Sequence, residues 1–433
     1  MRIALLTSEY PTEANFDGGL ANYLHRTAHL LADAGHDVEI FTRCFQYDPD
    51  WGILDPVDEV FEHGNHLVHR VAHRWPGEFF YHYLPVFKRF SGYRSELKWA
   101  WALNTALERR HREKPFDVVQ AATARACGVV ASWRQRIPLV TRASSIRLLC
   151  DAAEQQTTTS ANRQRDRLVS LQMRRSQSVY APSRHVCDLV SDRYCVRARV
   201  LEPPVDLAPF SNATFACPET ERSERYVLHF GTLGRLKGTD RLISILPQLC
   251  DRISDLRFVF IGTSKQDECD RSYHSLIQQR CSQHSDRISV LPAMRHPELF
   301  RYVAHARVVV LPSRIDNLPN TCLESMAFQR VVVATRDASF EQLIEHTQNG
   351  FLTPQEDNDA LLQQIEQAWN LSDPERQRIG KAARHALERM APKRAIGELV
   401  QLFEQVSGGV PTTHVSHPRT NTKTKCTPKK GHP

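Results

Sequence analysis

Residues 308–335 read VVVLPSRIDNLPNTCLESMAFQRVVVAT, and this stretch predicts two strands with a polar loop and a short helix between them. The first strand ends at Leu311, and the second begins at Val331. Both are short, continuous apolar runs rich in valine, which is typical of strands that are buried on both faces of a sheet. Such strands, alternating with helices, predict a parallel sheet with helices on both of its faces.

Two carboxylates lie eight positions apart within this stretch. Asp316 falls in the polar loop, and Glu324 falls in the first turn of the predicted helix. A carboxylate can accept two hydrogen bonds from a vicinal diol, and the N–H groups of a loop and of a helix N-terminus suit a diphosphate. The segment therefore fits a ribose and a phosphorylated sugar, although a capped helix with two surface carboxylates explains the same residues.

The alternation of strands and helices runs through most of the chain. Before residue 203 it predicts strands at 3–7, 38–42, 117–121, 139–142, 178–181 and 199–201. The stretch 203–224 holds four prolines and little periodicity, and we interpret it as a linker. Beyond it the alternation restarts, with strands at 226–230, 256–261, 287–291, 307–311 and 331–334. Two such halves place a cleft between them, where the carboxyl ends of strands from both halves meet.

Two common functions of such folds are disfavoured by the sequence. A dinucleotide site needs G-x-G-x-x-G directly after the first strand, but residues 8–13 read SEYPTE. The second half carries FGTLG at 230–234, which also lacks this fingerprint, and G-x-x-x-x-G-K-[ST] does not occur. Hydride transfer and P-loop phosphoryl transfer are therefore disfavoured.

The positive charge of the chain is concentrated at its C-terminal end. The 433 residues carry a formal charge of +7, but residues 407–433 hold five basic residues and no Asp or Glu, so residues 1–406 carry only +2. A nearly neutral folded part does not create the field that binds a phosphate backbone, and we expect no nucleic-acid partner. Residues 407–433 are rich in Pro, Thr, Lys and Gly and are predicted to form a disordered basic tail.

The remaining composition favours a cytoplasmic protein. No run of about 18 apolar residues occurs, and the N-terminus does not predict a secretory leader. The 11 cysteines are scattered without a C-x-x-C pair, which favours a reducing compartment over a disulfide framework or a zinc site. His63, His66, His69 and His73 lie around a predicted strand, and we interpret them as surface histidines rather than metal ligands.

Residues 312–335 resemble the E-x7-E region of the retaining glycosyltransferases of family 4, which have the GT-B fold. The family's pattern is close to PS-x-x-E-x-x-P-x-x-x-x-E-A-M-A-x-G-x-P-V-V-A-T, and this chain reads PSRIDNLPNTCLESMAFQRVVVAT. Other similar motifs follow in the family's order: GGL at 18–20, AGHDV at 34–38, APS at 181–183, EPPVD at 202–206, FGTLGRLKG at 230–238 and NGFL at 349–352. The resemblance spans about residues 1–400.

The resemblance implies a fold class, a division into domains and an activity. The fold would be α/β of the GT-B type, with two Rossmann-like, doubly wound parallel-sheet domains facing a central cleft. Residues 1–204 would bind the acceptor, residues 205–390 would bind the nucleotide-sugar donor, and residues 391–406 would form a helix that packs back toward the N-terminal domain. The activity implied is that of a hexosyltransferase, which moves a sugar from a nucleotide-diphosphate sugar to an acceptor hydroxyl with retention of the anomeric configuration.

The resemblance also assigns candidate site residues. Lys237 and Arg235 would neutralise the leaving diphosphate and Asp316 would hold hydroxyls of the donor sugar, which makes these three the catalytic candidates. Glu324 would bind the ribose. The other donor-binding candidates supply main-chain N–H groups or leave room for the donor: Gly18, Gly19, Gly262, Asn317, Leu318, Asn320 and Thr321. No metal and no other cofactor is expected, because cationic side chains would carry the diphosphate charge.

Departures from the family's pattern leave alternatives open. Thr232 stands where the family has an arginine, Asp316 is one methylene shorter than Glu, and Gln120 and Ser144 stand where a histidine is often found in the first half. A catalytically impaired nucleotide-sugar-binding protein and a GT-B-fold nucleotide-sugar epimerase are the alternatives. The acceptor would be a glycan, a lipid-linked molecule or a small molecule. Residues 75–101, aromatic and basic, predict a packed connection, an acceptor-binding lip or a peripheral contact with the inner face of the membrane.

Overall fold

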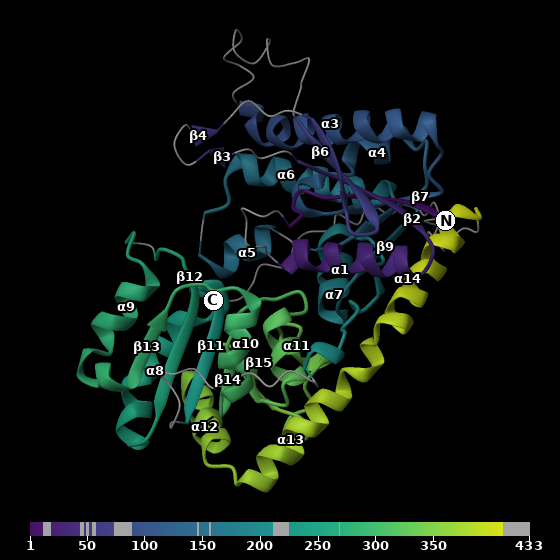
Figure 1. The fold of residues 1–433 in the computed structure, drawn as a ribbon. Coiled ribbons are helices and arrows are strands. Elements are labelled where there is room, and N and C mark those ends of the chain that lie inside the picture. The colour runs from purple at the N-terminus through teal and green to yellow at the C-terminus, as the bar shows by residue number, and fades with distance from the viewer. Residues whose placement is uncertain are drawn as a thin grey trace, which may run out of the picture.

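The computed structural model describes residues 1–11, 19–43, 47–48, 52–53, 58–72, 89–144, 147–155, 157–210, 225–267 and 269–409. Two α/β lobes, each built on its own sheet, lie one above the other in Figure 1. A short antiparallel pair, β3 (Tyr47–Asp48) with β4 (Gly52–Ile53), stands apart from both sheets. The two lobes correspond to the two halves of the predicted strand–helix alternation.

The first sheet is doubly wound around its central strand. Its strand order is β10-β9-β8-β7-β1-β2-β6-β5, so the chain builds outward from β1 on one side and then returns to the other side with β7. Neighbouring strands are parallel except β5 and β6, which form an antiparallel hairpin at one edge. The strands are β1 (Arg2–Leu6), β2 (Asp37–Arg43), β5 (Glu59–His63), β6 (His66–Val71), β7 (Val118–Ala122), β8 (Leu139–Arg142), β9 (Ser178–Ala181) and β10 (Arg199–Val200).

Helices cover both faces of this sheet. Apolar side chains of α1 pack on one face, and those of α3 and α4 pack on the other. The helices of the first lobe are α1 (Gly19–Asp33), α3 (Ser91–Glu113), α4 (Val129–Arg134), α5 (Arg147–Ala153), α6 (Ser160–Arg175) and α7 (Arg184–Tyr194). Because a parallel sheet needs apolar cover on both faces, its strands read as continuous apolar runs, and all five residues of β1 are buried.

The second sheet repeats this winding. Its order is β13-β12-β11-β14-β15-β16, and all its pairs are parallel. Its strands are β11 (Tyr226–Leu233), β12 (Arg257–Ser264), β13 (Ile288–Leu291), β14 (Val308–Leu311), β15 (Val331–Thr335) and β16 (Phe351–Thr353). Its helices are α8 (Thr239–Arg252), α9 (Tyr273–Arg280), α10 (His296–His305), α11 (Asn320–Ala327), α12 (Asn358–Trp369) and α13 (Asp373–Ala386). The predicted pair of doubly wound sheets is thereby confirmed.

The chain crosses between the lobes at two places that lie side by side. The main-chain N–H of Val205 donates to the carbonyl of Met390 at 2.9 Å, and Arg389 forms an ion pair with Glu202 at 3.0 Å. After this point α14 (Pro392–Ser407) runs back along the first lobe, where Figure 1 shows it in yellow. Its apolar face, including Phe403, joins the core formed by α1 and the first sheet.

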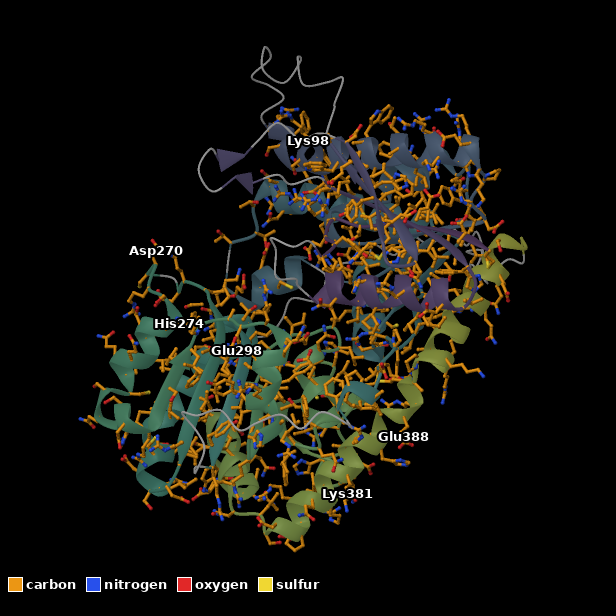
Figure 2. The ribbon with its side chains drawn as sticks, in the orientation of Figure 1. Lys98, Asp270, His274, Glu298, Lys381 and Glu388 are labelled. Atoms are coloured by element: carbon orange, nitrogen blue, oxygen red, sulfur yellow. The ribbon has the colours of Figure 1, made fainter. Side chains whose placement is uncertain are left out.

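Charged side chains lie on the outside of both lobes. Lys381 on α13 and Glu388 in the turn that follows it are exposed at the edge of the second lobe (Figure 2). No helix in the described ranges combines the length and the apolar character that crossing a bilayer requires. Of the tail expected at 407–433, Ser407 ends α14 and residues 410–433 lie outside the described residues. Residues 75–88 of the aromatic and basic segment also lie outside them.

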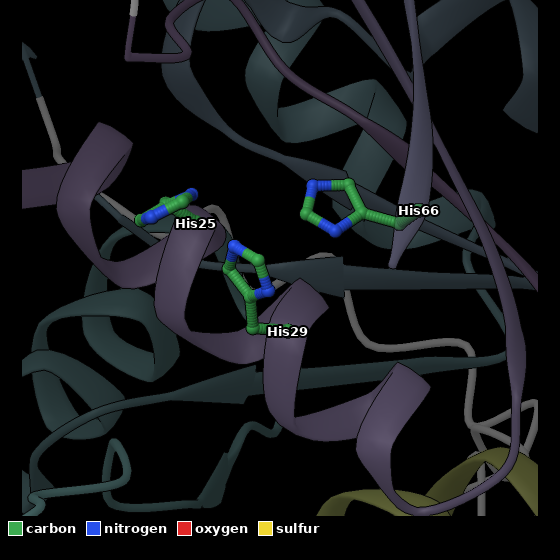
Figure 3. Close-up of side chains that lie close together, drawn as sticks. All are labelled: His25, His29 and His66. Atoms are coloured by element: carbon green, nitrogen blue, oxygen red, sulfur yellow. The ribbon is translucent and has the colours of Figure 1, made fainter. Parts of the chain in front are cut away.

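The interpretation of four surface histidines was wrong for two of them. His66 and His69 are only 4% and 6% exposed. The reason is that α1 packs on one face of β6 and α3 packs on the other, and His69 stacks on Phe41 with ring centroids 4.5 Å apart. His66 instead faces α1, where Figure 3 shows it beside His25 and His29. His73 lies outside the described residues.

Candidate active site in the cleft between the lobes

A cleft of about 660 Å³ is lined by residues of both lobes. It lies at the carboxyl ends of strands from both sheets, where each strand order reverses and where ligands of doubly wound folds bind. The first lobe contributes Gly19 and Arg142, among others, and the second lobe contributes Lys237, Asp316 and Glu324. The fold therefore brings the predicted carboxylates and one predicted cation to a single wall.

Asp316 and Lys237 are in direct contact at this wall. The Lys237 ammonium donates a hydrogen bond to Oδ2 of Asp316, while Oδ1 accepts one from the main-chain N–H of Asn317 at 3.0 Å. The side chains of Lys237 and Asp316 are 30% and 13% exposed, so both remain accessible from the cleft. The pair places a mobile positive charge and a fixed acceptor next to each other.

A buried arginine fixes the two loops that carry this pair. Arg314 donates to Asp240 at 2.7 and 2.9 Å and to Glu356 at 2.5 and 3.0 Å, and its main-chain N–H donates to the carbonyl of Leu236 at 3.0 Å. Burial alone would lower the pKa of Arg314, but the hydrogen bonds to Asp240 and Glu356 raise it above its ordinary value. Because this guanidinium stays charged and multiply bonded, it holds the loop after β11 against the loop after β14.

Arg235 occupies a different place from Lys237. Its guanidinium forms an ion pair with Asp240 at 3.2 Å, and Arg235 is not among the residues that line the cleft. Thr232, which stands where the resembling family has an arginine, does line the cleft. Of the two predicted cations, the structure therefore brings only Lys237 to the cleft wall.

Gly262 is required by the backbone of the donor-side wall. It pairs with Gly231 across β12 and β11, and a Cβ at position 262 would stand 1.6 Å from the carbonyl oxygen of Gly231. The φ of Gly262 is +153°, a value that other residues rarely adopt. Both glycines line the cleft, so the wall here is bare backbone that a flat ring can approach.

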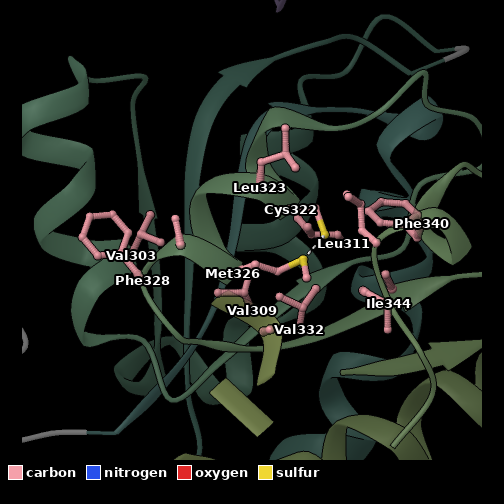
Figure 4. Packing of buried hydrophobic residues seen from close by; sticks show 14 of the residues in the cluster. Val303, Val309, Leu311, Cys322, Leu323, Met326, Phe328, Val332, Phe340 and Ile344 are labelled. Carbon is pink, nitrogen blue, oxygen red and sulfur yellow. Dashed lines mark hydrogen bonds between the residues drawn. The ribbon is translucent and has the colours of Figure 1, made fainter. Parts of the chain in front are cut away.

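Glu324 faces the cleft because the other side of α11 is anchored in the core. Cys322, Leu323 and Met326 pack against β14, β15 and the segment after β15, as Figure 4 shows. Cys322 and Met326 are fully buried, and burying a Met side chain stabilises a fold by about 1.5–3 kcal/mol. The carboxylate of Glu324 lies 3.5 Å from Nε2 of His296 at the start of α10.

The predicted amide donors cluster at the N-terminus of α11. Asn317, Leu318, Asn320 and Thr321 all line the cleft, although the N–H of Asn317 already bonds to Asp316. The first N–H groups of a helix have no partner within the helix, so those of Asn320 and Thr321 suit an anion. A Cβ on Gly19 would stand 3.3 Å from Nδ2 of Asn320, which shows how closely the two lobes approach. Gly18 lies outside the described residues.

The wall on the first lobe is built from stacked and hydrogen-bonded side chains. The guanidinium carbon of Arg142 lies 3.8 Å from the ring centroid of Tyr23, and the Tyr23 hydroxyl lies 2.9 Å from that of Tyr180. Tyr180 donates to Gln120 at 2.7 Å, so Gln120 is buried behind the wall, whereas Ser144 lines the cleft.

Sequence reasoning missed Arg295 and His296, which complete the wall beside Glu324. The signal was available: Pro297 is typical of the first turn of a helix, so residues 292–295 had to form the loop after β13, with His296 at the start of the helix. A loop at the carboxyl end of a parallel strand lies at the ligand-binding edge.

Family models match each lobe separately. Residues 224–370 match "Glycosyl transferases group 1", and residues 18–204 match "Glycosyl transferase 4-like domain". An uncharacterized glycosyltransferase of Haemophilus influenzae is 25% identical over 141 residues, which are 32% of this chain and 38% of that protein. The D-inositol 3-phosphate glycosyltransferase of Pseudarthrobacter chlorophenolicus is 26% identical over 372 residues, which are 81% of this chain and 83% of that protein.

Solved structures share the arrangement of both lobes. The structure of HepE from Anabaena with UDP and glucose superimposes with a TM-score of 0.68 and 17% identity, covering 94% of this chain and 100% of that one. This likeness confirms the predicted GT-B fold. With a glycosyltransferase model matching each lobe, the chain belongs to the glycosyltransferases of the GT-B type.

Proposed function

We propose that this protein moves a sugar from a nucleotide-diphosphate sugar to an acceptor hydroxyl, with retention of the anomeric configuration, as the resemblance to family 4 implies. The observation that carries the proposal is the convergence of Lys237, Asp316, Glu324 and the N-terminus of α11 on one cleft wall. The HepE structure with UDP and glucose supports a donor of this class.

The wall offers one group for each part of such a donor. Glu324 accepts hydrogen bonds from the two ribose hydroxyls, and the bare backbone at Gly231 and Gly262 receives the base. Lys237 and the first N–H groups of α11 neutralise the diphosphate. Asp316, held by the N–H of Asn317, accepts hydrogen bonds from the donor sugar. A charged acceptor makes each of these bonds worth about 1.5–3 kcal/mol.

Transfer then depends on stabilising the leaving diphosphate. As the anomeric bond breaks, negative charge grows on the diphosphate, and Lys237 and the α11 amides stabilise that charge more than they stabilise the bound donor. The acceptor hydroxyl attacks the same face of the sugar, and its proton passes to the departing phosphate oxygen. These groups carry the charge without a metal ion in the reaction.

The two lobes divide the substrates between them in this proposal. Residues 205–390 hold the donor, residues 1–204 hold a glycan, lipid-linked or small-molecule acceptor, and α14 couples the lobes. The Val205–Met390 and Glu202–Arg389 contacts are suited to act as the hinge about which the cleft closes and expels water. We further propose that the protein works in the cytoplasm, where nucleotide sugars would reach it.

The test compares Glu324→Gln with Glu298→Gln. Glu298 lies on the neighbouring α10 and is exposed, outside the cleft lining (Figure 2). Calorimetric titration with UDP-, GDP- and ADP-sugars identifies the donor, and nucleotide release measures turnover. Glu324→Gln should weaken donor binding by about 10- to 100-fold, since charged hydrogen bonds to the ribose are lost, while Glu298→Gln should match the wild type.

Two outcomes would contradict the proposal. If Glu324→Gln binds and turns over the donor as the wild type does, Glu324 does not bind the donor. Donor binding without any transfer or hydrolysis, in the presence of a broad acceptor set, would instead favour the impaired binding protein, and isomerised donor without acceptor would favour the epimerase.

A further inference from the structure

Four histidines meet between α1 and the β5–β6 hairpin, away from the cleft. His25 and His29 stand one helical turn apart on α1, and His63 and His66 are paired on either side of the two-residue turn between β5 and β6. His25, His29 and His66 each place a ring nitrogen within 4.8 Å of the other two (Figure 3). None of the four lines the cleft.

The hairpin turn is shaped to receive the ring of His29. Gly64 adopts a φ of +64°, and a Cβ at this position would stand 2.3 Å from Cε1 of His29. Asn65 next to it donates to the carbonyl of His29 at 3.3 Å and to Oδ1 of Asp33 at 2.6 Å. The turn is therefore fastened to α1, and its glycine is the residue that leaves room for the imidazole.

Further hydrogen bonds orient the rings. The hydroxyl of Tyr10 lies 3.2 Å from Nδ1 of His25 and 2.6 Å from Nε2 of His66, and Oδ1 of Asn65 lies 3.2 Å from Nδ1 of His66. A histidine that coordinates a metal donates the N–H of its other ring nitrogen to such a partner. Asn65 engages Nδ1 of His66, so Nε2 is the ring atom left to coordinate an ion, which would displace the Tyr10 hydroxyl that now contacts it. The same hydroxyl contacts Nδ1 of His25, so Nε2 is the coordinating atom of that ring.

We propose that His25, His29 and His66 bind one transition-metal dication, with Zn²⁺ as the ion that fits three imidazoles best. Imidazole nitrogen prefers zinc, copper and nickel to magnesium or calcium, and the cluster offers no carboxylate of its own. Zinc bonds to histidine nitrogens at about 2.0–2.1 Å, so the three rings turn inward from their present separation. His63, which stacks on His25 with centroids 4.9 Å apart, covers the fourth side.

Such an ion would tie α1 to the edge of the first sheet. The helix begins at Gly19 in the cleft wall, so fixing His25 and His29 also fixes the first turn of α1. The site is structural in this proposal and takes no part in sugar transfer.

The test titrates the full chain, first freed of metal by a chelator, with Zn²⁺ in competition with a chromophoric chelator. The wild type should bind one Zn²⁺ ion tightly. His29→Gln and His66→Gln should each weaken the Zn²⁺ affinity by more than the roughly 10- to 100-fold that is typical of losing an outer hydrogen bond. Tyr10→Phe should fall within that range. His385→Ala serves as the matched control, because His385 is an exposed residue of α13 in the second lobe, beside Glu388.

Two further measurements separate a lost ligand from a damaged fold. Far-ultraviolet circular dichroism and the melting temperature of the metal-free variants establish that they fold. Zn²⁺ should then raise the melting temperature of the wild type and of His385→Ala, but not of His29→Gln, and Co²⁺ should give the visible bands of a tetrahedral site only in the first two. Equal Zn²⁺ affinity, or an equal rise in melting temperature, in folded His29→Gln and His66→Gln would overturn the proposal.

Discussion

The ammonium group of Lys237 contacts the carboxylate of Asp316, although the two residues lie 79 positions apart in the chain. They meet because β11 and β14 are neighbours in the second sheet and because Arg314 holds the loops after these strands together. The Asp316 carboxylate balances the positive charge of Lys237 when no anion is bound in the cleft. A diphosphate that binds Lys237 would therefore release Asp316 for the hydroxyls of the donor sugar.

The first prediction concerns the Lys237 charge. Lys237→Met removes the cation and keeps most of the stem, so kcat for sugar transfer should fall by about 10²–10³, as when a group that stabilises transition-state charge is removed. Nucleotide release at saturating donor measures this. Lys381→Met, an exposed lysine on α13, is the control and should leave kcat unchanged. A Lys237→Met enzyme with wild-type kcat would show that other groups carry the leaving-group charge.

A pair of glycine substitutions should shift stability in opposite directions. In Gly262→Ala the new Cβ would clash with the carbonyl of Gly231, so β11 and β12 must separate and the free energy of unfolding should fall by about 1–3 kcal/mol or more. Gly397 lies inside α14 with open space around its Cβ position, so Gly397→Ala should raise the free energy of unfolding by about 0.5–1 kcal/mol. Urea unfolding followed by circular dichroism measures both, and a Gly262→Ala protein as stable as the wild type would contradict the geometry.

Acid should destabilise the protein through His229. This buried ring donates from Nδ1 to the carbonyl of Val310 at 2.8 Å, and its Nε2 lies 3.1 Å from the hydroxyl of Thr239. Burial, aided by the charge of Lys237, lowers its pKa from 6.5 to about 4. Below pH 6.5 the His229 ring takes up a proton in the unfolded chain, whereas in the folded protein it stays neutral until the pH approaches 4. Stability is therefore full above pH 6.5 and falls between pH 6.5 and about 4, by about 3 kcal/mol from His229 alone.

The His229→Asn variant isolates this contribution. It should be less stable than the wild type at pH 7, because the ring's packing and its contact with Thr239 are lost, yet it should lose less stability between pH 6.5 and 4.5. Urea unfolding at several pH values measures the slope. His385→Ala, an exposed histidine, should keep the wild-type slope. An unchanged slope in His229→Asn would mean that His229 does not resist protonation in the folded state.

The sequence was sufficient where local pattern and tertiary environment agree. The strands of both sheet centres are continuous apolar runs, so their positions could be read directly, and β8 and β9 have the predicted bounds. The helix predicted after the Asp316 loop is α11, whose apolar residues form the face that is buried in the core. Gln329, which replaces a family glycine, confirms the turn geometry behind that motif, because its φ is +59°, a value that glycine adopts more easily.

Long-range pairing and polar burial could not be read from the pattern. No apolar periodicity marks α6, because its buried face uses Gln164 and Gln172, which accept hydrogen bonds from the main-chain N–H groups of Gly92 and Gly128, each at 3.0 Å. The histidine cluster joins α1 to a hairpin more than 30 positions away. The pairing of Arg235 with Asp240, which keeps Arg235 off the cleft wall, likewise depends on side-chain geometry that the sequence does not show.

The last prediction concerns how Arg142 affects acceptor choice. This guanidinium stacks on Tyr23, is 7% exposed and lines the cleft from the lobe proposed to hold the acceptor. Arg142→Met should weaken binding of a phosphorylated acceptor more than binding of its neutral counterpart, because only the former uses the charge. Calorimetry with a hexose phosphate and with the matching free hexose, each in the presence of nucleotide, provides the comparison. Arg134→Met, whose guanidinium stacks on Trp101 outside the cleft, should change neither affinity. Equal weakening of both ligands by Arg142→Met would mean that the residue shapes the wall and does not select for charge.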